Sequence, residues 1–328
     1  MKYIKLNYTD IEVSPVCLGT VNYGTAMTNA DSKKQLSDFL EMGGNFIDSA
    51  HIYGDWGGPN LLCRSERVIG EWLKETGNRD KVVLATKGSH PDWGKMEISR
   101  LHAKDINKDL NESLEYLYTD YIDLYLLHRD DPNVEVSEII DCLDAAQKAG
   151  KIKHYGCSNW SLSRMKEAQA YAKETGKQGF VVNQLMWSLA DINFYNLLDK
   201  TFILLDEETL NYHIETGMNV MSYMSIAKAY FQRRYNGEVL PNSVTDVYGS
   251  ATNDKIYEKS LDLVNKGDYS FMDLSFQYLA EETRFPSVPI ASFDNYDQLA
   301  TGIEAFKKPI PKELIDEYKK IKKFVYWK

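Results

Sequence analysis

Four residues with acid–base side chains stand at or just after the ends of apolar runs in this sequence. Asp48 lies near the end of NFIDSA, Tyr53 follows it by five residues, Lys87 lies near the end of KVVLATKG, and His128 ends YIDLYLLH. A carboxylate, a phenol, an ammonium and an imidazole at one place can together move a proton to or from a substrate oxygen. The spacing therefore raises the question of which fold would bring them together.

Lys87 would lower the pKa of the Tyr53 phenol and so allow it to act as an acid or base. A phenol with a pKa near 10 is a poor proton donor and acceptor at neutral pH. An ammonium about 4 Å away, at an effective dielectric near 20, favours the phenolate by roughly 4 kcal/mol. That energy lowers a pKa by about two to three units. A partly buried lysine stays charged beside a carboxylate, which Asp48 can provide. His128 could donate a hydrogen bond to the same substrate oxygen.

Each of the four residues also has an interpretation without catalysis. Asp48 could cap a loop, Lys87 could be a solvated charge, His128 could be a hydrogen-bonded core residue, and Tyr53 could be a core aromatic residue with its hydroxyl outward. Any one of these explanations is ordinary for a single residue. The occurrence of all four types at successive strand ends favours a proton-transfer site.

Eight apolar, β-branched runs predict the strands that would position these residues. They are VSPVCLGT, NFIDSA, KVVLATKG, YIDLYLLH, IKHYGCSN, FVVNQLMW, MNVMSYMS and SVPIAS. Segments of helical periodicity alternate with the first six runs, at residues 31–44, 64–77, 98–117, 137–150 and 161–176. Eight such units closing on themselves form an α/β fold of the (β/α)8 TIM-barrel type, whose active site lies where the strands end. A doubly wound sheet would need a G-x-G-x-x-G motif after an early strand, and the sequence has none.

Two further segments complete the predicted fold. Residues 2–13 alternate around a turn and predict an N-terminal hairpin that closes the floor of the barrel. A long insertion, residues 228–286, precedes the last strand. It is expected to contain a polar loop at 233–251 and helices at 253–267 and 270–282, near the C-terminal face of the barrel. We interpret residues 1–328 as a single barrel domain.

Composition limits the classes of partner. The 328-residue chain has a formal net charge of -10 and no basic run, which argues against nucleic acid and anionic membranes as ligands. Neither a signal peptide nor an apolar span long enough for a membrane is visible, so we expect a cytoplasmic location. The four cysteines lack C-x-x-C spacing, and no metal site is predicted. The expected partner is a small molecule, and the oligomeric state is not indicated.

The motifs around these strand ends resemble those of the aldo-keto reductases over essentially the whole chain. They occur in the family's order: LGT at 18–20, FIDSAHIYG at 46–54, ATKG at 85–88, DLYLLHRDDP at 123–132, GCSNW at 156–160, NQL at 183–185 and SYMSIAKAYF at 222–231. The resemblance implies a barrel that binds a nicotinamide cofactor without a Rossmann domain. It also implies hydride transfer between that cofactor and a carbonyl or alcohol carbon.

The resemblance assigns a role to each of the four acid–base residues. Tyr53 would be the general acid/base, Lys87 would lower its pKa, Asp48 would hold Lys87, and His128 would orient the substrate carbonyl. It also implies that Ser158, Asn159 and Gln184 hold the nicotinamide carboxamide, that Tyr223 stacks on the ring and that Ser225 lies near the pyrophosphate. The full set of expected cofactor-binding residues is Thr20, Ser158, Asn159, Gln184, Tyr223, Ser225, Ser292, Asp294 and Gln298.

The sequence departs from the family pattern after the last strand. Family members often show a pattern such as I-P-G-A-R-x-x-x-Q-L-x-x-N there, in which a basic residue meets the 2'-phosphate of NADP. Here Ser292 replaces the glycine, Asp294 stands where the basic residue is common, and Gly302 stands in place of the asparagine, while Gln298 fits. An aspartate would repel a 2'-phosphate and could accept hydrogen bonds from ribose hydroxyls. We therefore predict a preference for NAD(H) over NADP(H).

The substrate is less well indicated. Aromatic and polar residues in the loops around the expected pocket mouth suggest a polar carbonyl compound, such as a sugar or cyclitol derivative, although the aromatic residues could equally be loop packing. The predicted pocket residues are Asn22, Tyr23, Trp56, Trp93, Arg129 and Trp160.

Two other functions remain open from the sequence. A lysine at a barrel strand end also serves Schiff-base aldolases, in which case borohydride reduction with substrate would tag Lys87. Some relatives of the family act as non-catalytic, cofactor-sensing subunits. Tight cofactor binding without turnover of any carbonyl would favour that function.

Overall fold

The closed barrel predicted from the eight apolar runs is confirmed. The computed structural model describes residues 2–280 and 284–322. Eight parallel strands pair in the order β10-β3-β4-β5-β6-β7-β8-β9 and close on themselves. Their bounds are Cys17–Gly19 (β3), Phe46–Asp48 (β4), Val83–Gly88 (β5), Ile122–Leu127 (β6), Ile152–Ser158 (β7), Val182–Met186 (β8), Asn219–Tyr223 (β9) and Ser287–Ala291 (β10).

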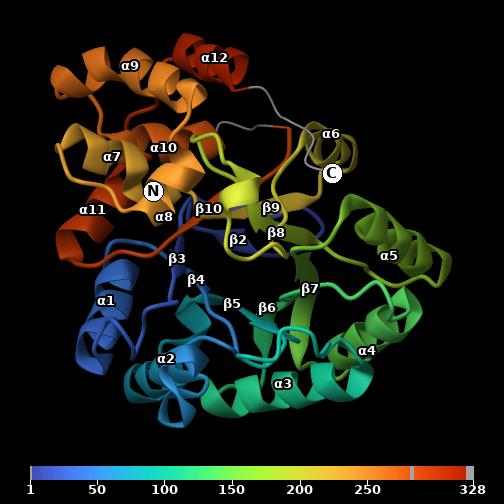
Figure 1. The fold of residues 1–328 in the computed structure, drawn as a ribbon. Coiled ribbons are helices and arrows are strands. Elements are labelled where there is room, and N and C mark those ends of the chain that lie inside the picture. The colour runs from blue at the N-terminus through green and yellow to red at the C-terminus, as the bar shows by residue number, and fades with distance from the viewer. Residues whose placement is uncertain (1, 281–283, 323–328) are drawn as a thin grey trace.

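Helices surround the barrel (Figure 1). Each of the first five covers one of the predicted helical segments, although α3 begins five residues later than expected because Leu101 is buried and His102 is extended. They are α1 (Asn29–Glu41), α2 (Arg64–Thr76), α3 (Ala103–Tyr116), α4 (Val136–Lys148) and α5 (Leu162–Glu174). Three helices for which we made no prediction are α6 (Glu207–Thr216), α11 (Tyr296–Glu304) and α12 (Lys312–Ile321).

The insertion before the last strand is more helical than predicted. The predicted helices correspond to α9 (Ala251–Asn265) and α10 (Phe271–Ala280), and the expected end of the second, Glu281 and Glu282, lies outside the described residues. The prediction of a polar loop at 233–251 is wrong, because the second half of α7 (Tyr230–Tyr235) and all of α8 (Asn242–Tyr248) lie within it. Helix α8 buries Val244, Val247 and Tyr248. In Figure 1 these helices gather on one side of the barrel.

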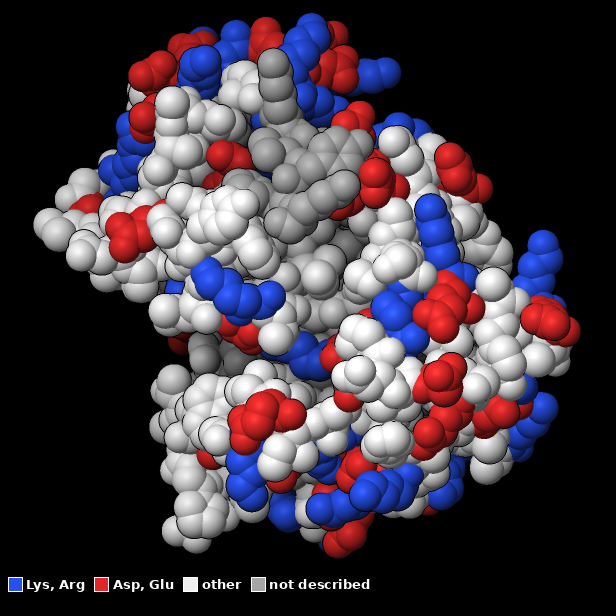
Figure 2. Space-filling view, turned by 45° about the vertical axis from the view of Figure 1, so that its right-hand side comes forward, with Lys and Arg blue, Asp and Glu red and all other residues white. Residues whose placement is uncertain are grey.

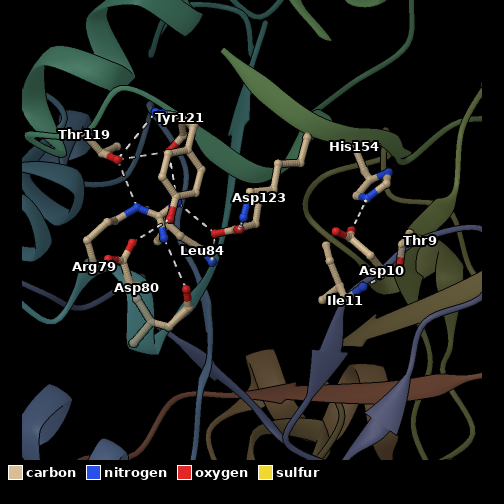
Figure 3. A network of polar contacts seen from close by, with 12 residues as sticks. Thr9, Asp10, Ile11, Arg79, Asp80, Leu84, Thr119, Tyr121, Asp123 and His154 are labelled. Atoms are coloured by element: carbon tan, nitrogen blue, oxygen red, sulfur yellow. Dashed lines mark hydrogen bonds and ion pairs between the residues drawn. The ribbon is translucent and has the colours of Figure 1, made fainter. Parts of the chain in front are cut away.

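The N-terminal hairpin closes the floor of the barrel, as predicted. Its strands β1 (Ile4–Lys5) and β2 (Glu12–Val13) are antiparallel, and Leu6, Ile11 and Val13 join the apolar cluster formed by residues of the barrel strands. Polar contacts surround this end of the barrel (Figure 3). Asp10 of the hairpin lies 3.0 Å from His154 of β7, and nearby Arg79 and Lys153 each donate to Asp123 at 2.8 Å.

Asn219 links the hairpin to the floor. Its amide accepts from the Asn7 peptide N–H at 2.8 Å and donates to the carbonyls of Asn7 and Val181. Asn219→Ala removes the side-chain partner of the Asn7 peptide N–H and carbonyl, while Val181 O keeps the backbone N–H of residue 219, so we expect a loss of about 1–3 kcal/mol in the free energy of unfolding. Urea unfolding measures this loss. The exposed Asn111→Ala is the control, and equal unfolding midpoints for the two variants would contradict the role of Asn219.

The surface does not favour one sign of charge on the face shown in Figure 2. Acidic and basic side chains are interspersed there and form no continuous patch of either sign. Among the residues that the structure describes, no helix has both the length and the apolar character needed to cross a membrane.

Candidate active site

A buried ion pair lies at the C-terminal ends of β4 and β5. The Lys87 ammonium donates to Asp48 Oδ2 at 2.6 Å and to the carbonyl oxygen of Ser49 at 2.6 Å. Gln184 of β8 donates to the other carboxylate oxygen of Asp48 at 2.8 Å. The two charged side chains are only 1% and 3% exposed. Hydrogen bonds therefore satisfy both carboxylate oxygens, which is the condition under which a buried pair is tolerated.

The turn after β4 returns Tyr53 to this ion pair. The turn is held against β5, since Ser49 N–H donates to Ala85 O and His51 N–H donates to Lys87 O. The Lys87 Nζ atom lies 5.0 Å from the centroid of the Tyr53 ring. Gly54 allows the chain to leave the turn with a φ of 113°, and a Cβ at that position would lie 2.5 Å from Leu61 O. The structure thus brings Asp48, Tyr53 and Lys87 together.

Burial and charge act in opposite directions on this group. Burial raises the pKa of Tyr53 and the Lys87 ammonium opposes it, but the net pKa lies above the usual value for tyrosine. Lys87 therefore lowers the pKa of Tyr53 relative to a buried phenol without a neighbouring cation. The expectation that this pKa falls below 10 is wrong, because burying a phenolate costs more free energy than the ammonium returns. Burial lowers the pKa of Lys87, but Asp48 and Tyr53 outweigh it, so the pKa is raised and the lysine stays charged.

His128 lies beside Tyr53 and is neutral. Their ring centroids are 6.0 Å apart with an edge-to-face angle of 73°. Burial, followed by the neighbouring His90 and Arg129, holds the pKa of His128 well below its usual value. Its Nδ1 atom is buried without a hydrogen-bond partner among the described residues. A neutral imidazole carries one N–H, so it can orient a carbonyl oxygen without transferring a net charge.

Amide and hydroxyl groups gather next to His128. Asn159 donates to Ser158 Oγ at 3.1 Å and to His128 O at 3.3 Å, while its Oδ1 accepts from the Tyr223 hydroxyl at 2.6 Å. Ser158 and Gln184 are directly paired in the barrel. The structure thus brings together four of the expected cofactor residues. Amide and hydroxyl groups thus lie together beside the aromatic ring of Tyr223 at this part of the barrel rim.

The hydroxyl groups of three other expected cofactor residues donate hydrogen bonds to backbone carbonyls of the barrel. Thr20 Oγ1 donates to Asp48 O at 2.9 Å and lies 2.7 Å from Ser65 Oγ. Ser225 donates to Ile290 O at 2.6 Å and Ser292 to Gly19 O at 2.9 Å. Thr20 and Ser225 are also buried. These contacts cross-link neighbouring strand ends and so fix the shape of the rim.

The last two expected cofactor residues lie at the start of α11. Asp294 is exposed, and its peptide N–H donates to Gln298 Oε1 at 2.9 Å. The side chain of Asn295 caps the helix by accepting from Gln298 N–H. Gly302 packs under Phe293, where a Cβ would come within 2.5 Å of the ring. Asp294 is thus a solvent-facing carboxylate at a helix N-terminus.

Only some of the expected pocket residues are exposed near Tyr53. Trp56 and Trp93 are 39% and 58% exposed, and their rings meet edge to face at 5.9 Å. The Trp56 ring is also 6.3 Å from that of Tyr53. Asn22 is partly exposed in the loop after β3, where its carbonyl oxygen accepts two turn hydrogen bonds. Trp56 and Trp93 therefore form an exposed aromatic pair beside Tyr53.

Tyr23 and Trp160, which we expected to line the pocket, lie in the core instead. Both are buried in the main apolar core. The Tyr23 hydroxyl donates to Gln35 at 3.0 Å, and the Trp160 indole donates to Arg129 O at 3.2 Å. Their aromatic rings pack between barrel and helices, where apolar burial outweighs exposure at a loop. Neither side chain reaches the opening.

Arg129 is near the site, and three hydrogen bonds hold its guanidinium. It donates to Thr201 Oγ1, His128 O and Asp199 Oδ2 at 2.8, 2.8 and 2.9 Å. Asp199 and Thr201 belong to the loop between β8 and α6, which also places Phe202 against Tyr223, with ring centroids 5.6 Å apart. Arg129 therefore holds this loop over the amide corner.

His90 and Ser49 are site residues that sequence reasoning missed. The His90 ring lies 4.7 Å from that of His128, and Ser49 supplies a carbonyl oxygen to Lys87. His90 follows Lys87 by three residues. A polar residue just past a barrel strand end was a signal that could have identified it. The backbone carbonyl of Ser49 could not have been identified from the sequence, because every residue type has one.

Comparison with known proteins decides the family. The model of the "Aldo/keto reductase family" matches residues 15–323. The chain belongs to the aldo/keto reductase family. It is thus an oxidoreductase of the type that reduces carbonyl groups with a nicotinamide cofactor and acts on small molecules, which confirms the resemblance seen in the motifs.

Individual relatives of this aldo/keto reductase differ in how much of their length matches. The uncharacterized oxidoreductase YrpG of Bacillus subtilis is 32% identical over 232 residues, which cover 69% of this chain and 67% of YrpG. Norsolorinic acid reductase stcV of Emericella nidulans is 36% identical over 56% of this chain, but the match spans 49% of that protein. Protein tas of Escherichia coli is 24% identical over 97% of this chain and 96% of its own length.

A solved structure shares the fold. The thermostable aldo-keto reductase Tm1743, in complex with the inhibitor epalrestat, has a TM-score of 0.73 and 19% sequence identity. The match covers 98% of this chain and 100% of the other. At that identity the likeness concerns the barrel alone, and the chemistry of the site is argued from this chain's own residues.

Proposed function

We propose that this reductase moves a hydride between a nicotinamide cofactor and a carbonyl or alcohol carbon, with Tyr53 as the general acid/base. The observation that carries the proposal is the buried Lys87–Asp48 ion pair beside the Tyr53 ring, with His128 at the edge of the same ring. A charged, desolvated ammonium is the group that stabilises a phenolate as it forms.

Each residue has one task in the proposed reduction. A bound nicotinamide would supply the hydride to the carbonyl carbon. The Tyr53 hydroxyl gives its proton to the carbonyl oxygen, and the adjacent Lys87 ammonium stabilises the phenolate that remains. Asp48 keeps Lys87 charged and in place, while neutral His128 orients the oxygen through one hydrogen bond. In alcohol oxidation the Tyr53 phenolate accepts the proton instead.

The raised pKa of Lys87 argues against the aldolase alternative. A Schiff-base lysine must lose its proton to attack a carbonyl. Burial lowers the pKa of Lys87, but Asp48 and Tyr53 raise it above its usual value, so the amine stays protonated. Borohydride with substrate should therefore leave Lys87 untagged.

A screen of cofactor oxidation tests the proposed reaction. Aldehydes, ketones and, in the reverse direction, sugar alcohols are offered with both nicotinamide cofactors, and absorbance at the nicotinamide band is followed. We expect turnover of polar carbonyl compounds, because Trp56 and Trp93 offer faces on which a ring can stack. Tight cofactor binding without turnover of any compound would instead favour the cofactor-sensing function.

The preference for NAD(H) is part of the proposal. Asp294 is exposed and Asp297 lies in the first turn of α11, so a 2'-phosphate near this helix N-terminus would meet two carboxylates. We expect a higher kcat/KM with NADH than with NADPH. Asp294→Arg should raise kcat/KM for NADPH about tenfold, which corresponds to about 1.4 kcal/mol of phosphate attraction.

Glu174→Arg is the matched control for this charge change. Glu174 is exposed at the end of α5, so the same reversal there should leave both cofactor efficiencies unchanged. Steady-state kinetics with each cofactor measure the effect. A wild-type enzyme that is more efficient with NADPH would refute the preference, and an equal response to both variants would remove Asp294 from cofactor selection.

A further inference from the structure

His90 is a second histidine next to the proposed proton-transfer site. It follows β5, is 7% exposed, and lies with its ring centroid 4.7 Å from that of His128 at an angle of 65°. The proposed mechanism uses Tyr53, Lys87, Asp48 and His128 and leaves His90 without a task. A buried imidazole at this position needs a chemical or packing explanation.

The contacts of His90 define which of its nitrogens carries the proton. Nδ1 lies 2.7 Å from the carbonyl oxygen of Pro91. Because a carbonyl oxygen can only accept, the proton of a neutral ring must sit on Nδ1. Burial, followed by Arg129, lowers the pKa of His90 to about 4, so the ring is neutral at physiological pH. Nε2 of His90 is therefore an acceptor without a proton.

Two rows of rings extend from Tyr53. One runs through His128 to His90, with centroid distances of 6.0 and 4.7 Å. The other runs through Trp56 to Trp93, with distances of 6.3 and 5.9 Å. His90 and Trp93 lie three residues apart in the loop between β5 and α3, so both rows end on the same loop. The rings of both rows are therefore candidates to contact a substrate whose carbonyl oxygen meets Tyr53.

We propose that His90 is a specificity-determining residue that accepts a hydrogen bond from a hydroxyl group of the substrate. A hydroxyl on a carbon next to the carbonyl carbon or one beyond it is the group proposed to reach His90, which lies 4.7 Å from the His128 ring. The favoured substrates are hydroxy-aldehydes and hydroxy-ketones, including sugars. This inference rests on the proposed function and adds the group that the enzyme recognises.

The residues next to His90 are less suited to accept a hydrogen bond from a substrate hydroxyl group. Tyr53 and His128 serve the carbonyl oxygen, and Arg129, which three hydrogen bonds hold in place, has only donors and cannot accept from a hydroxyl group. An acceptor at Nε2 rejects compounds that place a carboxylate or a second carbonyl oxygen there, because two sets of lone pairs would face each other. The proposed site therefore separates hydroxy-carbonyl compounds from keto acids.

The test compares pairs of substrates that differ only in hydroxyl groups on the carbons next to the carbonyl carbon or one beyond it. Glyceraldehyde is paired with propanal and hydroxyacetone with acetone, and kcat/KM is measured for the wild type, His90→Phe and His90→Gln. Phe keeps a ring against His128 but removes the acceptor, so the preference for the hydroxylated partner should fall at least about tenfold. Gln keeps an acceptor oxygen and should retain part of the preference.

A change in packing alone gives a different result. If His90 only supports His128, His90→Phe lowers kcat/KM for both members of a pair by the same factor, and the proposal is overturned. An unchanged ratio also overturns it. His154→Phe, at the opposite end of the barrel beside Asp10, is the control that should leave every ratio as in the wild type (Figure 3).

The same measurements separate this inference from the proposed function. A wild-type enzyme with the same kcat/KM for propanal as for glyceraldehyde would agree with the proposed reaction but would contradict hydroxyl recognition by His90. An enzyme that reduces none of the four compounds but reduces other carbonyl compounds of the screen keeps the proposed reaction and contradicts hydroxyl recognition, and one that turns over no compound at all contradicts both. Reduction of hydroxylated compounds with a ratio that His90→Phe abolishes supports both.

Discussion

Tyr53→Phe is expected to lower kcat for carbonyl reduction by about 10²–10⁴-fold, the usual contribution of a positioned acid/base group. The substitution removes the only proton that the proposed mechanism delivers to the substrate oxygen. Cofactor affinity should stay nearly unchanged, because the ring of Tyr53 remains against Lys87 and the amide corner around Asn159 is untouched. Steady-state rates and a fluorescence titration with reduced cofactor measure the two quantities.

Tyr125→Phe is the matched control for the loss of a hydroxyl group. Tyr125 lies in β6, is fully buried, and has no hydrogen-bond partner for its hydroxyl among the described residues. Its removal should leave kcat unchanged and the fold intact. A near-normal rate in Tyr53→Phe would remove Tyr53 from the proposed role, and a similar loss in both variants would indicate a general effect on the barrel.

The barrel was predictable because its strands are buried on both faces. Such strands appear as short apolar runs, and the alternating helices carry the charge, so the order of elements follows from hydrophobicity alone. The short helices α7 and α8 were not predictable in this way. Their polar composition resembles a loop, and only the buried Val244, Val247 and Tyr248 reveal the amphipathic face of α8.

The Asp48–Lys87 ion pair was predictable from residue types, whereas the direction of the net pKa shift of Tyr53 was not. Asp48 and Lys87 end adjacent strands, and barrel geometry brings such ends together. The pKa of Tyr53 depends on how deeply the hydroxyl is buried, which sequence does not specify, and burial turned out to be the larger effect. The direction of an aromatic side chain is equally hidden. Tyr23 and Trp160 occur next to strand ends but face the core.

Lys87→Met is expected to shift the pH dependence of residual activity upward by about two units. Burial raises the pKa of Tyr53 and Lys87 opposes it, so removing the ammonium raises that pKa further. Alcohol oxidation needs the phenolate, so its half-maximal rate should move to higher pH. Rates measured across pH in the oxidation direction test this shift, and an unshifted profile would count against tuning by Lys87.

Stability must be separated from tuning, because Lys87→Met also leaves Asp48 as an unpaired buried charge. That should cost about 3–5 kcal/mol in the free energy of unfolding. Asp48→Asn combined with Lys87→Met removes both charges, so much of the stability should return while the ammonium stays absent. Asp48 raises the pKa of Tyr53 by less than Lys87 lowers it, so if Lys87 acts on Tyr53 electrostatically, the double variant keeps part of the upward shift in the pH profile. If the double variant recovers the wild-type profile together with its stability, Lys87 serves only to hold the fold.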